Sequence, residues 1–139
     1  MDITVYDKLY EAVERAITDF NVGREYKVTI TTVSPQTPKY PLVVFEEITN
    51  QSRTRYYGSR EQISTLGYRF NIFAKAVKSK TNQTICREIM QVVVDFMQKK
   101  IGLNLISNNP LPREGTNGEI FRQAVVFQRP YNENREKFY

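Results

Sequence analysis

"STLGYRFNIFAKAV", Ser64 to Val77, is the stretch from which the fold of this chain can be worked out. Every second residue from Tyr68 to Ala76 is aromatic or aliphatic, and three of the four residues between them are polar. This alternation is typical of a β-strand with one face in the core and the other face less buried.

Two further segments before this strand also read as strands. "PLVVFEEIT", Pro41 to Thr49, is apolar on both faces at its start and amphipathic later, and "EYKVTITTV", Glu25 to Val33, alternates. The stretch "SPQTPKYP" between them holds three prolines, so we expect a stiff connection there. Near the C-terminus, "GEIFRQAVVFQR", Gly118 to Arg129, predicts a fourth strand.

Two amphipathic helices are predicted from apolar residues that recur every three or four positions. The first helix ends at Asn21 and Gly23, and the second has Lys99 and Lys100 in its last turn and Gly102 just beyond it. The apolar stripes are Val5, Leu9, Ala12, Val13, Ala16, Ile17 and Phe20 in the first helix and Ile85, Ile89, Val92, Val93, Phe96 and Met97 in the second.

The predicted element order is therefore α-β-β-β-α-β, which indicates an α+β fold. We expect a single, mostly antiparallel sheet with two helices packed on one face. The stretch "SNNPLPREGTNG" after the second helix is predicted to be a polar loop. Residues 1–129 form one domain in this interpretation, and "PYNENREKFY", residues 130–139, is a C-terminal arm or tail.

The composition disfavours several functional classes. The 139 residues include one cysteine, Cys86, and no histidine, which removes the usual general base, the usual zinc ligands and any internal disulfide. We therefore predict no enzymatic activity, no metal and no cofactor, with Cys86 as a packing residue in a reducing compartment. No apolar run is long enough to cross a membrane, so no membrane association is expected.

The segment "NQSRTRYYGSREQ", Asn50 to Gln62, joins the second and third predicted strands and forms the tip of a long β-hairpin. It contributes +2 of the net charge of +5, from three arginines and one glutamate. Arginine and tyrosine are enriched at protein interfaces, so a subunit or partner contact is one interpretation. The candidate interface residues are Arg53, Arg55, Tyr56, Tyr57 and Arg60.

A small α+β module that binds nucleic acid through the basic hairpin, residues 50–63, is the alternative. "LGYRFNIF", Leu66 to Phe73, partly matches the aromatic pattern of RNA-recognition modules, although those modules place a strand before their first helix. A solvated hairpin without a partner is the third interpretation. Loops of this length without structure of their own are usually functional or disordered.

The element order and three segments, "YPLVVFEEITNQ", "GYRFNIFAKA" and "FRQAVVFQ", resemble the small tail-completion or tail-terminator proteins of long-tailed bacteriophages. The resemblance covers nearly the whole chain. It implies a non-enzymatic virion protein that forms a ring, typically a hexamer, at the head-proximal end of the tail.

Such a ring terminates the tail tube and joins it to the head connector. The implied partners are other copies of the chain, the tail tube protein and the head-tail connector protein, with DNA only as cargo passing through the lumen. The implied location is the virion tail, assembled in the cytoplasm of the host bacterium. Related small folds also serve as head-tail adaptors and tube proteins.

Overall fold

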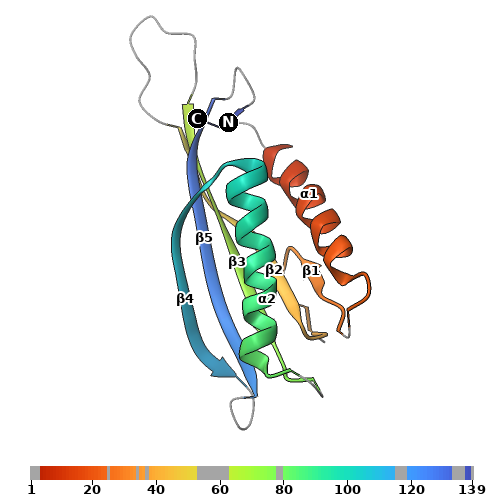
Figure 1. Ribbon diagram of the computed structural model, residues 1–139. Helices are drawn as coiled ribbons and strands as arrows, with labels where there is room; N and C mark the ends of the chain where they lie inside the picture. Colours follow the sequence, from red (N-terminus) through yellow and green to blue (C-terminus); the bar gives the residue numbers. More distant parts are fainter. Residues whose placement is uncertain are drawn as a thin grey trace, which may run out of the picture.

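The computed structural model describes residues 4–24, 26–33, 35–36, 38–52, 63–77, 80–114, 119–132 and 137–138. Within them the chain forms an α+β fold with one mixed sheet and two helical segments (Figure 1). The elements are α1 (Thr4–Asn21), β1 (Thr29–Thr31), β2 (Leu42–Ser52), β3 (Ile63–Ala74), α2 (Asn82–Asp95) with its π-helical continuation η1 (Phe96–Ile101), β4 (Asn104–Glu114), β5 (Ile120–Asn132) and β6 (Lys137–Phe138).

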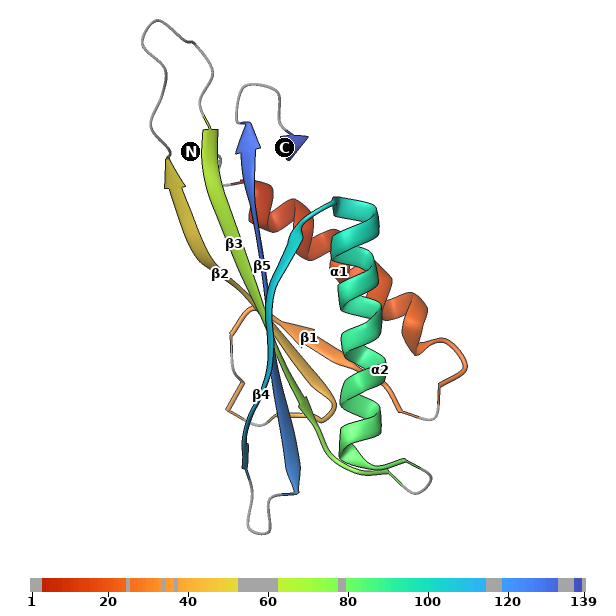
Figure 2. The same cartoon turned by 60° about the vertical axis from the view of Figure 1, so that its left-hand side comes forward.

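Five strands form the main sheet in the order β1-β2-β3-β5-β4, and the short β6 pairs with β5. The β1–β2 pair is parallel and the other pairs are antiparallel. Both helices lie on the same side of the sheet, and no helix of the described residues lies on its other side (Figure 2).

The third strand, β3, lies at the centre of this sheet and pairs along its length with β2 and β5. The predicted alternation is confirmed, because every second side chain from Leu66 to Ala74 is buried in the core under the helices. Phe70 stacks on Phe45 of β2 at 4.5 Å and meets Phe127 of β5 edge-on at 5.8 Å, measured between ring centroids. The buried set on β3 is Leu66, Tyr68, Phe70, Ile72 and Ala74.

The two apolar helical stripes are largely confirmed. Leu9, Val13, Ile17 and Phe20 of α1 and Ile85, Cys86, Ile89, Val93 and Met97 of the α2–η1 segment belong to one core cluster with the sheet. Gly102 has φ of 88°, a left-handed conformation, and its amide donates to the Met97 carbonyl at 2.8 Å. A glycine favours this backbone because it has no Cβ, so the predicted end of the second helix is confirmed.

The polar loop predicted after the second helix is wrong, and so is the total of four strands. Residues 104–114 form β4, an edge strand that pairs only with β5. Its prolines, Pro110 and Pro112, are tolerated because an edge strand leaves half of its backbone groups without a ladder partner. Two register irregularities, between Leu105 and Ser107 and between Leu111 and Glu114, remove the alternation that would have marked it as a strand.

The first predicted strand is much shorter than expected, since only Thr29–Thr31 pair with a neighbour. Tyr26 and Val28 are nevertheless buried at the positions that the alternation predicted. Because β1 and β2 run parallel, the Pro-rich link has to carry the chain from the end of β1 back to the start of β2. Figure 2 shows the described residues of this link on the side away from the helices, next to β2.

The end of the chain continues the sheet beyond residue 129. Strand β5 extends to Asn132, and Lys137–Phe138 pair back onto it. The remaining arm residues, 133–136 and 139, lie outside the described residues.

Ile89 and Phe96 provide a test of this packing. Ile89 is fully buried, whereas Phe96, predicted on the same stripe, is only partly buried. We expect Ile89→Ala to lower the free energy of unfolding by about 2–5 kcal/mol, and Phe96→Ala by roughly 1–2 kcal/mol because less apolar surface is lost. Chemical denaturation followed by circular dichroism measures both. A larger loss for Phe96→Ala than for Ile89→Ala would contradict the arrangement of α2 and η1.

Candidate functional site

The interface residues predicted from the sequence, Arg53, Arg55, Tyr56, Tyr57 and Arg60, lie outside the described residues. The hairpin stem that carries them is described. Strands β2 and β3 pair in antiparallel register as far as Ser52 and Ser64, with one irregularity between Glu47 and Thr49. Strand β5 accompanies β3 to the same level, where Asn132 pairs with Ile63. The three strands are therefore paired up to the residues that flank the segment 53–62.

The aromatic strand does not offer a stacking surface for nucleic-acid bases. Tyr68 and Phe70, which carried the partial match to RNA-recognition modules, are both 0% exposed beneath the helices. Phe73 points to the other side of the sheet, and the guanidinium of Arg122 lies 5.3 Å from its ring centroid. RNA-recognition modules stack bases on aromatic rings that are exposed on the sheet. Tyr68 and Phe70 are not exposed and pack in the core instead.

The side of the sheet away from the helices is the outer sheet face. On β2 the Glu46 carboxylate accepts hydrogen bonds from Arg69 at 2.5 Å and from Asn71 at 2.8 Å. Next to them on β5 lie Ala124 and Val126, both half-buried. Leu42 and Val44 of β2 point to the same side as Glu46 but are buried, so the outer sheet face is taken as the residues on this side that are exposed or half-buried. These are Glu46 on β2, Arg69, Asn71 and Phe73 on β3, Arg122, Ala124, Val126 and Gln128 on β5, and Asn104, Ser107, Asn109 and Leu111 on β4.

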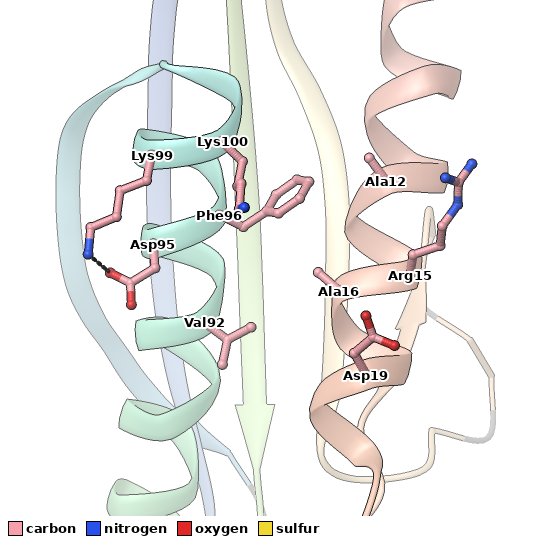
Figure 3. Close-up of a pocket in the computed structure, with 9 residues that line it drawn as sticks. All are labelled: Ala12, Arg15, Ala16, Asp19, Val92, Asp95, Phe96, Lys99 and Lys100. Atoms are coloured by element: carbon pink, nitrogen blue, oxygen red, sulfur yellow. Dashed lines mark ion pairs between the residues drawn. The ribbon is translucent and has the colours of Figure 1, made fainter.

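A groove of about 630 Å³ separates α1 from α2 and η1 on the helical side of the molecule (Figure 3). Ala12 and Ala16 face Val92 and Phe96 across it, so its walls are apolar. The small alanine side chains leave this space open between the helices. The charged lining residues are Arg15, Asp19, Asp95, Lys99 and Lys100, of which Asp95 and Lys99 form an ion pair at 3.8 Å.

This groove could hold an apolar side chain within a rim of mixed charge. The sequence placed Val92 and Phe96 on the buried stripe but gave no measure of the distance between the helices. That distance depends on how each helix packs on the sheet, which periodicity does not report.

A cluster of charged groups joins the start of α2 to the segment that follows α1. Glu88 accepts hydrogen bonds from Lys80, at 2.6 Å, and from the Tyr26 hydroxyl, while Arg24 lies 3.9 Å away. The Lys80 hydrogen bond, followed by that from Tyr26, lowers the pKa of Glu88 below its ordinary value. Burial, followed by the hydrogen bond to Glu88, raises the pKa of Tyr26. These contacts hold α2 against the segment that follows α1, and the Glu88 carboxylate is engaged in them.

Cys86 is buried on α2, and burial raises the pKa of its thiol to about 12. A thiol that stays protonated at neutral pH is a poor nucleophile, which agrees with a packing role. Within the part of the chain that the structure describes, no three His, Cys, Asp or Glu side chains are grouped to hold a metal ion. No helix among these residues is long and apolar enough to span a membrane.

The chain matches no protein-family model, and no curated protein matches it.

The Glu88 cluster predicts a pH-dependent contribution to stability. Because the folded-state pKa of Glu88 is lowered, its contribution is present above the unfolded-state pKa, about 4.3, and is lost as the pH falls through the lower folded-state value. We expect Glu88→Gln to reduce the free energy of unfolding by about 1 kcal/mol at pH 7, and by less at pH 3.

Urea denaturation of both proteins at the two pH values measures this difference. Glu11→Gln, at an exposed position of α1, is the matched control and should change little at either pH. An equal loss for Glu88→Gln at pH 7 and pH 3 would show that the carboxylate charge does not contribute.

Proposed function

We propose that this chain is a structural virion protein that forms a ring at the head-proximal end of a phage tail. In this role it terminates the tail tube and joins it to the head connector. The α+β fold and the segments "YPLVVFEEITNQ", "GYRFNIFAKA" and "FRQAVVFQ", which resemble tail-completion proteins, support the proposal.

The observation that carries the proposal is the stem of the β2–β3 hairpin. Its two strands run in register to Ser52 and Ser64, and β5 supports β3 as far as Ile63. A segment rich in arginine and tyrosine on a paired, three-stranded base suits a docking contact, because the strands restrict where its two ends can move. The function needs no reaction, since docking and termination depend on shape and charge.

The proposed partners are other copies of the chain in a hexameric ring, the tail tube protein and the connector protein. DNA would pass through the lumen, where arginines could meet phosphates without reading bases. The burial of Tyr68 and Phe70 removes the aromatic surface on which the alternative, a nucleic-acid-binding module, would partly depend. That alternative then rests on the basic hairpin alone.

Replacing Arg53, Arg55 and Arg60 together with glutamine tests the hairpin contact. We expect the variant to fold with nearly wild-type stability, because exposed loop charges contribute little. It should fail to form rings, or its tails should fail to join heads. Light scattering and negative-stain imaging measure ring formation, and complementation of a phage that lacks the gene measures joining.

The control is Lys39, Arg87 and Lys100 replaced by glutamine, which removes the same charge from exposed positions outside the hairpin. Nucleic-acid binding is measured in parallel over a range of salt concentrations. If the hairpin variant assembles normally but loses salt-sensitive binding, with a slope smaller by about 0.9 per lost phosphate contact, the assembly role is wrong. If neither property changes, the hairpin is a solvated loop.

A further inference from the structure

The outer sheet face has the composition of a protein interface. Around Ala124 and Val126 it carries Arg69, Asn71 and Phe73, and none of its twelve residues is a lysine. Interfaces are enriched in arginine and aromatic residues and depleted of lysine. The chain has nine lysines; Lys75 comes just after β3, where its amine lies 5.1 Å from the Tyr40 ring centroid, and none is among these twelve residues.

The polar groups of this face are held in place by their own neighbours. Arg69 is bound to Glu46, which also accepts from Asn71, and Arg122 lies over the Phe73 ring. Side chains that are already ordered lose less conformational entropy when a partner covers them.

The exposed face of α1 differs in charge from the rest of the molecule. The chain has a net charge of +5, yet the exposed ionisable residues of α1 are four acids and two bases, a net charge of −2. The outer sheet face carries two arginines and one glutamate, a net charge of +1. The acids of α1 are Asp7, Glu11, Glu14 and Asp19, and the bases are Lys8 and Arg15.

We propose that the outer sheet face of one copy packs against α1 of a second copy. The two surfaces have opposite charge and lie on opposite sides of the subunit (Figure 2). A contact between two different surfaces is heterologous, so each copy can bind one neighbour on each side, and repetition closes a ring if the rotation allows. The inference rests on the proposed ring and names the surfaces that build it.

Ala124→Glu tests the sheet side of the contact. The larger charged side chain would stand at the centre of the outer sheet face, outside the buried core cluster, so the monomer should keep its fold and most of its stability. We expect the concentration for half-assembly to rise at least about tenfold, toward a 16.3-kDa monomer in light scattering. Thr84→Glu is the control, because it adds the same charge at the exposed first turn of α2.

Charge reversal tests which two surfaces meet. One variant carries Arg69→Glu and Arg122→Glu, and the other carries Glu11→Lys and Glu14→Lys. We expect each variant alone to remain monomeric, and an equimolar mixture to assemble, because each reversed face then meets an oppositely charged face on its neighbour. Circular dichroism and denaturation midpoints of each variant confirm that the monomers are folded.

Three outcomes distinguish an error in this contact from an error in the proposed ring. If the wild type assembles and Ala124→Glu assembles equally well, the proposed contact is wrong while the ring stands. If the α1 variant alone assembles normally, the sheet face meets a different surface, such as a second sheet face, and the contact is also wrong. If the wild type stays monomeric up to millimolar concentration, both the contact and the self-assembled ring are overturned.

Discussion

The packing of the β3 aromatic residues against the helices is the constraint on which the rest of the structure depends. Phe70 lies between Phe45 and Phe127, and Tyr68 lies 5.6 Å from Phe45 between ring centroids, so three adjacent strands contribute to one aromatic layer. Tyr6 of α1 stacks on Phe45 at 4.9 Å and donates its hydroxyl to the Phe45 carbonyl. This hydrogen bond satisfies the polar end of a partly buried ring, and burial raises the pKa of Tyr6 to about 12.

This layer also explains why the two sides of the sheet differ. Because successive side chains of a strand point to opposite faces, filling one face with aromatic rings leaves the intervening residues on the other. On β3 these are Arg69, Asn71 and Phe73, and on β5 they include Ala124 and Val126. The outer sheet face and the hairpin stem therefore arise from the same strands that form the core, which gives any partner bound there a rigid support.

The elements with strong periodicity could be predicted from the sequence, and the elements at the edges could not. Both helices and the strands β2, β3 and β5 have residues in a regular apolar pattern that depends on contact with the core. The edge strand β4 carries three asparagines and two prolines, since only one side of its backbone must pair. For the candidate site, the sequence identified a basic, tyrosine-containing hairpin. It did not identify the interhelical groove or the outer sheet face, because both depend on distances between elements far apart in the chain.

The sequence by itself determined which residues enter the core and where most of the regular elements lie, because burial imposes a period of two on a strand and of 3.6 on a helix. It also limited the available chemistry, through the absence of histidine and the presence of one cysteine. Only the tertiary structure decided that β1 pairs in parallel with β2 and that β5 lies between β3 and β4. Strand order is set by contacts between distant segments, and a local pattern carries no information about which distant segment supplies them.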